Sequence, residues 1–220
     1  MIKREFLMLN SPSTAKGRPK SLEKRTKILT SASQLFLHNG FVNTSMDNVA
    51  KHSGVSKQTV YSHFANKDDL FTAVIIDKCH EYRLDDLAHS HTQALRVPEF
   101  EEALQRLAVQ FVALMHDPIV CSMYQALISE SKTQPHVAQI FYQTGPLRTL
   151  IQVQQFIMGM FPSMAERDAF DYATDFFNLL KGEYHMKSIM GLYEPMSDSD
   201  QVIFAKQRCQ KFLQILPARV

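Results

Sequence analysis

Apolar residues recur along this chain at every third or fourth position, which is the spacing of amphipathic α-helices. No stretch shows the strict alternation of apolar and polar residues that is typical of a half-buried strand. The first clear pattern runs from Ser21, a helix-capping residue, to Asn39, and Gly40 ends it. Its apolar stripe consists of Ile28, Leu29, Ala32, Leu35 and Phe36.

A shorter pattern between Thr44 and Phe64 predicts two helices folded about a tight turn. Thr44 and Ser45 can each accept a hydrogen bond from the free N–H groups at a helix start. Gly54 suits the left-handed conformation with which helices end, and Ser56 can cap the helix that follows.

The remaining pattern predicts further helices. Asn66 caps a fourth helix that we expect to run to about His89 as one rigid rod joining the two parts of the chain. Later helices are expected to begin at Val97-Pro98, Asp117-Pro118, Pro135 (interrupted near Gly145-Pro146 and resuming to Met160), Pro162 and Ser197. The predicted fold class is all-α, with a three-helix helix-turn-helix head and a larger C-terminal helical domain.

The second short helix offers a polar face suited to DNA. With Val60 at the buried centre, Gln58 and Ser62 point nearly opposite, and Thr59 and Tyr61 flank them. Side-chain amides and cations on such a helix can bond base edges in the major groove. The alternative is an ordinary helical hairpin whose polar residues are simply solvated.

Composition limits where nucleic acid could bind. The chain has 220 residues, 45% hydrophobic and 21% charged, with a net charge of only +2. A uniformly basic surface is therefore excluded, and binding to DNA requires a local patch. Basic residues gather near the N-terminus, at Lys3, Arg4, Lys16, Arg18, Lys20, Lys24, Arg25 and Lys27.

These features together resemble a known family. The run Gly40-Phe41, Thr44, Val49-Ala50, Gly54-Val55-Ser56, Thr59-Val60-Tyr61, His63-Phe64, Lys67 and Leu70-Phe71 resembles the N-terminal domain of TetR-type transcriptional regulators. The segment Phe-Tyr-x-x-Gly-Pro at 141–146 resembles the AefR-like subgroup of C-terminal domains. The resemblance implies a helical dimer whose head binds DNA and whose larger domain binds a small effector.

The resemblance also implies roles for individual residues. Positions matching Lys57, Gln58 and Thr59 approach bases, whereas those matching Tyr61, His63 and Lys67 hold phosphates. Ser62 stands where the family often has a bulkier aromatic residue. The full set expected to bind DNA is Thr44, Ser45, Lys57, Gln58, Thr59, Tyr61, Ser62, His63 and Lys67.

The domain organisation expected from these patterns has three parts. Residues 1–20 form a basic arm, residues 21–65 the DNA-binding domain, and residues 66–220 the ligand-binding and dimerisation domain. Gly17-Arg18-Pro19-Lys20 resembles the arm with which many of these regulators reach the minor groove. Its alternative is a tail that only aids solubility.

The C-terminal half is rich in Phe and Met, and Met adapts readily in shape. Such residues usually form core, yet a switchable protein needs a cavity between helices, and apolar cavities bind apolar ligands. The residues expected to line a pocket are Phe111, Met115, Met123, Tyr124, Phe156 and Phe177. Residues 163–184 are apolar on two sides, which predicts a homodimer formed by the last two long helices.

Other classes of protein have little support. Cys79, Cys121 and Cys209 are widely spaced and match no disulfide framework or zinc motif. The pairs His89-x-His91 and Glu183-x-His185 lack a further ligand at metal-binding spacing, so no metal or cofactor is expected. No nucleophile elbow, phosphate loop or zinc-protease helix is present, so the chain is not expected to be an enzyme.

The sequence also carries no sign of a membrane or secreted protein. No apolar run is long enough to cross a bilayer, and the charged start is unlike a secretory signal. We therefore expect a soluble, cytoplasmic regulator, most often a repressor in this family. It would bind a pseudo-palindromic double-stranded operator and be released by a small, largely apolar effector. The alternative is a helical interaction or scaffold protein without DNA binding.

Overall fold

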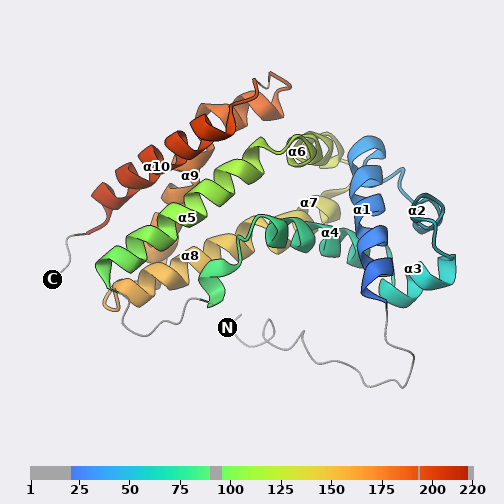
Figure 1. Cartoon of the computed structure of the whole chain (residues 1–220), viewed down its shortest axis with the longest axis horizontal. Coiled ribbons are helices and arrows are strands. Elements are labelled where there is room, and N and C mark those ends of the chain that lie inside the picture. The colour runs from blue at the N-terminus through green and yellow to red at the C-terminus, as the bar shows by residue number, and fades with distance from the viewer. Residues whose placement is uncertain (1–20, 90–95, 193, 218–220) are drawn as a thin grey trace.

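The protein is described by a computed structural model covering residues 21–89, 96–192 and 194–217 (Figure 1). These residues form helices and connecting turns, and no strand occurs among them, which confirms the predicted all-α fold. The helices are α1 (Leu22–Asn39), α2 (Met46–Ser53), α3 (Lys57–His63), α4 (Lys67–Glu81), η2 (Asp86–His89), α5 (Val97–His116), α6 (Pro118–Glu130), α7 (Pro135–Thr144), α8 (Pro146–Met160), α9 (Glu166–Ile189) and α10 (Asp198–Ile215).

The first three helices form a head at one end of the molecule (Figure 1). Their beginnings follow local signals, because Ser21, Ser45 and Ser56 each accept a hydrogen bond from a backbone N–H three residues later. Inside the head, the rings of Phe36, Phe41 and Phe71 lie within 5.7 Å of one another, centroid to centroid. Phe71 belongs to α4, so the core of the head is completed by the helix that follows it.

Helices α5, α8, α9 and α10 form the far part of the body, while α4, α6 and α7 lie between them and the head (Figure 1). Phe176 on α9 is fully buried, with its ring 5.0 Å from Phe212 on α10 and 5.2 Å from its neighbour Phe177. Phe177 in turn lies 4.7 Å from Phe111 on α5. Aromatic packing therefore ties these three helices together.

The helices of the described ranges differ from membrane spans in length or apolarity. No single helix there is long and apolar enough to cross a bilayer. The pair α5 and α6 reaches that length and apolarity only when the two are taken together, across a bend of 66°.

The prediction that α4 runs to about His89 is wrong. The helix ends at Glu81, Arg83 adopts a positive φ of 54°, and the chain turns into the short 3₁₀ helix η2. This turn buries Leu84 in the core and places Asp85 against Arg148 and Gln152 of α8. Packing against a helix 60 residues later therefore sets the end of α4, and no local glycine or proline announces it.

The prediction that a long helix begins at Pro162 is also wrong. Helix α9 begins at Glu166, after a turn in which the Met164 N–H donates to the Phe161 carbonyl. Phe161 and Met164 both pack against the core, and the Gln154 amide donates to the Glu166 carbonyl. Near its other end α9 is interrupted at Gly182, whose φ of 50° and ψ of −154° are non-helical.

Candidate nucleic-acid interface and effector cavity

The turn between α2 and α3 has the geometry expected of a helix-turn-helix. Gly54 takes the left-handed conformation, with φ 68° and ψ 21°, and its N–H donates to the Ala50 carbonyl. A Cβ at this position would meet open space, so glycine is favoured by backbone conformation and not by lack of room. The chain then enters α3 after only two further residues, which fixes the angle between the helices.

Helix α3 presents its polar side chains outward. Val60 is fully buried, whereas Lys57, Gln58, Tyr61 and Ser62 are exposed. No hydrogen bond of the Gln58 amide to another described residue is present, so this amide is available to a base edge. The helix therefore offers an uncommitted amide and a phenol on its open face.

The other hydroxyls of α3 are already engaged. Thr59 Oγ1 lies 2.9 Å from Ser56 Oγ, and the Ser62 hydroxyl donates to the Thr59 carbonyl at 2.7 Å. These bonds are exposed and can be exchanged for bonds to DNA. The Ser45 side chain caps α2, where its hydroxyl accepts a hydrogen bond from the Asn48 N–H.

Lys57 forms an ion pair with Asp47 of α2 across the turn. Both side chains are more than half exposed, and such surface pairs contribute little to stability because water and salt screen them. The Lys57 ammonium can therefore leave Asp47 for a phosphate or base at small cost.

Thr44, which the sequence predicts to contact DNA, does not belong to the exposed surface of this structure. Its side chain is 1% exposed. Its hydroxyl lies 2.8 Å from the Gly40 carbonyl and 3.1 Å from the Leu35 carbonyl, to which it can donate. Thr44 therefore braces the corner between α1 and α2, and Ser45 is the residue that caps α2.

Lys67 lies at the first position of α4, as expected, but its ammonium is directed at the protein. Nζ donates to the Phe41 carbonyl at 2.7 Å and the Val42 carbonyl at 3.3 Å, and it lies 4.2 Å from the Phe41 ring centroid. Burial lowers the pKa of Lys67, against the opposing effect of Asp68 and Glu130. Lys67 thus holds the α1–α2 corner, a role that its sequence position did not reveal.

His63 and Arg25 lie beside Phe64, which closes α3. The His63 ring is half-buried at 6.2 Å from the Phe64 ring, and the Arg25 guanidinium lies 4.8 Å over the same ring. Arg25 therefore keeps a cation close to the C-terminal end of α3. The basic residues before Ser21, including Gly17-Arg18-Pro19-Lys20, lie outside the described residues.

A mostly apolar cavity of about 100 Å³ lies in the body, between α4, α5, α6, α8 and α9. Five of the six residues expected to line a pocket contribute to its wall, namely Phe111, Met115, Met123, Tyr124 and Phe177. The cavity wall also includes Lys78, Asn178 and Lys181, which the sequence reasoning missed. Asn178 and Lys181 recur at helical spacing with Phe177 on α9, and that spacing was the available signal.

Phe156 does not line this cavity, so that expectation is wrong. Its ring is stacked on Phe100 of α5 at 5.0 Å, with 11° between the ring planes, and it is 3% exposed. It is a core residue farther along α8. An apolar residue can either line a cavity or pack closely in the core, and the sequence pattern does not distinguish these two positions.

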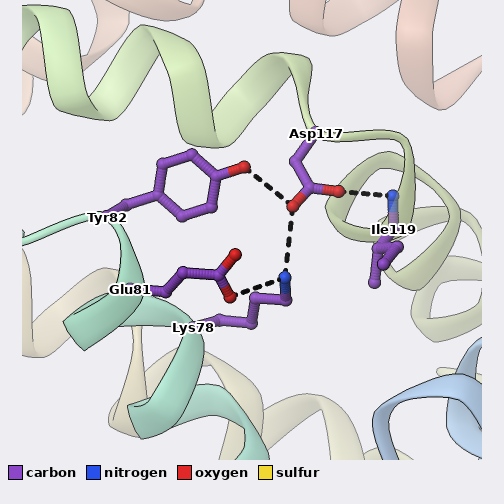
Figure 2. Close-up of polar contacts among 5 residues, drawn as sticks. All are labelled: Lys78, Glu81, Tyr82, Asp117 and Ile119. Atoms are coloured by element: carbon purple, nitrogen blue, oxygen red, sulfur yellow. Dashed lines mark hydrogen bonds and ion pairs between the residues drawn. The ribbon is translucent and has the colours of Figure 1, made fainter. Parts of the chain in front are cut away.

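A half-buried carboxylate joins the end of α4 to the corner between α5 and α6 (Figure 2). Asp117 accepts hydrogen bonds from the Tyr82 hydroxyl at 2.8 Å and the Ile119 N–H at 2.7 Å, and Lys78 Nζ lies 3.3 Å away. Burial by itself would raise the pKa of Asp117, but the bonds from Tyr82, Ile119 and Lys78 outweigh it and lower that pKa. Glu81 also pairs with Lys78, at 2.8 Å.

The three cysteines are free and buried. Burial raises the pKa of Cys79 to about 11 and that of Cys209 to about 12, and it raises the pKa of Cys121 as well. Because the thiolate is the reactive form, these thiols are chemically quiet. Within the part of the chain that the structure describes, no three His, Cys, Asp or Glu side chains come together as metal ligands; His91 lies outside it.

Comparison with known proteins agrees with this architecture. Residues 28–74 match the profile described as "Bacterial regulatory proteins, tetR family". Residues 102–215, more than half of the chain, match that of the "AefR-like transcriptional repressor, C-terminal domain". The chain belongs to the TetR family of transcriptional regulators.

Curated TetR-type relatives match over part of their length. The transcriptional activator FasR of Mycolicibacterium smegmatis is 34% identical over 120 residues, which are 53% of this chain and 51% of FasR. The regulator UidR of Escherichia coli K12 is 28% identical over 123 residues, 52% of this chain and 55% of UidR. This chain therefore spans about half the length of the curated relatives it matches.

Solved structures match over nearly the whole chain. A putative TetR-family regulator from Mesorhizobium loti has a TM-score of 0.70 at 22% identity, covering 90% of this chain and 98% of the other. The flavonoid-responsive regulator FrrA has a TM-score of 0.63 at 26% identity, covering 91% and 100%. The TetR fold therefore extends across head and body, and members of the family bind DNA operators and act as dimers.

Proposed function

We propose that this TetR-family regulator is a repressor that binds a pseudo-palindromic operator as a homodimer and releases it when a small, largely apolar effector fills the body cavity. In this proposal residues 21–65 bind DNA and residues 66–220 bind the effector and the second subunit. The residues proposed to contact DNA are Ser45, Lys57, Gln58, Thr59, Tyr61, Ser62 and His63, with Lys67 supporting them.

The observation that carries the proposal is the position of α4. Leu70 and Phe71, in its first half, are buried in the core of the head. Ile75 and Cys79, in its second half, line the cavity. A ligand that pushes α4 aside would therefore displace the head, even though α4 is shorter than expected and ends at Glu81.

A second connection supports the same coupling. Glu130, at the end of α6, accepts the Phe41 N–H at 3.1 Å from the corner after α1. Met123 and Tyr124 of α6 line the cavity, so this helix also touches both sites. Lys67 holds the neighbouring carbonyl of Phe41. Helix α4 therefore begins, and helix α6 ends, at the same corner of the head.

The energetics required of this coupling are modest. A ligand shifts the equilibrium only by its difference in affinity for the two states. Allosteric coupling is typically about 1–3 kcal/mol, which would lower the affinity for the operator by about 5–150-fold.

The apolar residues of α9 that predicted the homodimer are not free to form it. Phe177 and Phe212 are 4% and 0% exposed in the single chain, so the apolar surplus of α9 is covered by the chain itself. Large exposed apolar side chains instead lie at the end of α9 and on α10, at Met186, Met190, Leu192, Ile203 and Ile215. We expect Ile203→Glu to weaken the dimer in sedimentation, whereas Phe212→Asp would unfold the chain.

The test is binding to labelled duplex taken from upstream of the protein's own coding sequence, followed by fluorescence anisotropy. A scrambled duplex of equal length is the control. Benzyl alcohol and 1-octanol, as apolar probes, are then titrated into the protein–operator complex. Tighter binding to the upstream duplex than to the scramble, weakened by a probe, supports the proposal.

Each part of the proposal can fail separately. Absence of preference for any upstream duplex favours the alternative, a helical interaction protein that has lost DNA binding. A probe that strengthens operator binding would make effector control positive in sign, and FasR is itself named an activator. A probe that binds with equal affinity with and without operator would remove the coupling.

A further inference from the structure

The charges on the wall of the cavity are one-sided. Lys78 and Lys181 line it, and no carboxylate does so among the described residues. The two lysines differ in their surroundings. Lys78 is paired with Glu81 and Asp117, whereas no hydrogen bond or ion pair joins Lys181 to another residue in the described ranges.

Lys181 is also partly withdrawn from water. Its side chain is half-buried at the edge of the apolar wall, and burial lowers its pKa. An ammonium group taken out of water without a partner is costly, because nothing replaces the solvation it has lost. A negatively charged group in the cavity would offset that cost.

His185 and Tyr124, beside Lys181, stay uncharged at neutral pH, so they do not offset the Lys181 charge. His185, one turn later on α9, has a pKa lowered by burial and then by the Lys181 charge. Its ring packs edge-on against the Tyr124 ring at 5.0 Å, and Tyr124 lines the cavity. Burial raises the pKa of Tyr124, so its phenol stays protonated and can donate.

Asn178 completes a group of possible donors. It lies three residues before Lys181 on α9, lines the same cavity, and makes no hydrogen bond to another described residue. The Lys181 ammonium, the Asn178 amide and the Tyr124 hydroxyl are therefore three donors on a mostly apolar wall, whose other polar groups, Lys78, Thr149 and Thr174, bond to protein groups. Phe111, Phe177 and Met115 supply apolar surface in the same cavity.

We infer that the effector is a small amphipathic organic acid, with its carboxylate on Lys181 and Asn178 and its apolar body among Phe111, Met115 and Phe177. This inference rests on the proposed function and names the chemical class of its effector. A neutral apolar ligand would leave Lys181 unpaired, and an amine would meet two lysines. The free space of about 100 Å³ is smaller than the roughly 150 Å³ apolar cavity that holds benzene, so side chains of the wall must shift to admit even a single ring or a short chain.

The experiment compares ligands that share an apolar body and differ in the polar group. Benzoate, benzyl alcohol and benzylamine form one series, and octanoate, 1-octanol and octylamine form the other. Isothermal titration calorimetry on the full chain measures each affinity. In at least one series we expect the acid to bind about tenfold or more tightly than the alcohol, the span of one charge-assisted hydrogen bond, and the amine not to bind.

Variants then assign the preference to one side chain. Lys181→Met should lower the affinity for the acid to that of the alcohol and leave the alcohol unchanged, while Lys181→Arg should retain the preference. Lys187→Met is the matched control, because Lys187 lies on the same helix, outside the cavity, paired with Glu183. Circular dichroism confirms that each variant is folded.

Several outcomes would overturn the inference. These are equal binding of acid and alcohol by the wild-type chain, an acid preference that survives in Lys181→Met, or binding of none of the six probes. Operator binding is measured on the same samples. If the chain binds the operator and an alcohol releases it, the proposed function stands and only the organic-acid effector is wrong. If the chain does not bind the operator at all, that result counts against the proposed function and not against the ligand preference measured by calorimetry.

Discussion

The head and the body are held together by different kinds of contact. In the head, side-chain hydrogen bonds mostly join residues three or four positions apart, such as Ser45 to Asn48 and Ser56 to Thr59. In the body, beside similar local bonds, several join residues far apart, such as Tyr82 to Asp117, and Gln125 to the Ser188 carbonyl. The head is therefore a locally determined, rigid unit, while the geometry of the body depends on how distant helices pack.

That difference suits a switch. A ligand that enters between distant helices can change their packing, because no local turn fixes their spacing. The head responds as one piece, since its own contacts are short in sequence. The corner from Gly40 to Val42, which Glu130 and Lys67 contact, is the joint between the head and the body.

The largest expected effect comes from blocking that joint. Gly40 has φ 74° and ψ 175°, and a Cβ there would lie 2.1 Å from Glu130 Oε1. Such a backbone conformation costs a non-glycine residue about 1–3 kcal/mol, and the clash adds to it. We expect Gly40→Ala to lower the free energy of unfolding in urea by about 3 kcal/mol and to impair effector coupling.

Gly54→Ala is the matched control for the joint. Gly54 also has a positive φ, in the αL region, but open space surrounds its Cβ position. Its loss should be about 1 kcal/mol, the strain of a left-handed residue alone. Equal losses at Gly40 and Gly54 would show that Glu130 does not press on the corner.

The next effect concerns a long-range contact of the body. Asp117→Asn removes a charge that accepts bonds from Tyr82 and Ile119, so we expect a loss of about 2 kcal/mol at neutral pH. The folded-state pKa of Asp117 is lowered, so its stabilisation is present above the unfolded pKa of about 4 and is lost as pH falls through the folded value.

The check is urea unfolding of both proteins across a pH series. The gap between wild type and Asp117→Asn should be full at neutral pH and should narrow at pH values below that of the unfolded carboxyl. Asp171→Asn, at an exposed position on α9, serves as control and should change neither the free energy of unfolding at neutral pH nor its pH dependence. A gap that stays constant down to acid pH contradicts the stabilising role of the charge.

A reading residue of the head should affect DNA without affecting folding. Gln58 is exposed on α3, and its amide can bond an adenine edge twice. Gln58→Ala should weaken operator binding by about 1–3 kcal/mol and change binding to scrambled duplex little. Gln34→Ala, exposed on α1, is the control. An equal loss on both duplexes would mean that Gln58 does not read bases.

The smallest effect is expected at Lys67, whose ammonium can either brace the carbonyls of Phe41 and Val42 or bind a DNA phosphate. If it only braces Phe41 and Val42, Lys67→Met lowers the stability of the chain by about 1 kcal/mol and leaves the salt dependence of DNA binding unchanged. If it also holds a phosphate, both duplexes bind more weakly, and the salt dependence falls by about one ion per site. A salt series separates these roles.

Local signals explain why much of the fold could be predicted. The caps at Ser21, Ser45, Ser56, Asn66 and Ser197 act over about three residues, so the helices that they begin were placed correctly. The end of α4 and the start of α9 depend on Asp85 and Phe161 meeting distant partners. Those partners cannot be identified from spacing alone.

The candidate site divides in the same way. The exposed face of α3 follows from its helical wheel. The burial of Thr44 and the inward ammonium of Lys67 depend on how α1 meets α4, and the stacking of Phe156 on Phe100 depends on how α8 meets α5. Glu130 lies 89 residues from its partner Phe41, and nothing near it in the sequence marks that role.

The break in α9 at Gly182 has a consequence for how effector affinity depends on the concentration of the protein itself. Lys181 lies directly before the break, and the exposed Met186, Met190 and Leu192 follow it. If a bound acid changes the angle at Gly182, it also changes the surface proposed for the second subunit. Linkage is reciprocal, so effector affinity would then depend on protein concentration. Titrations of octanoate at increasing dilution of the protein should show a drifting affinity, and a constant value would mean that assembly and sensing are independent.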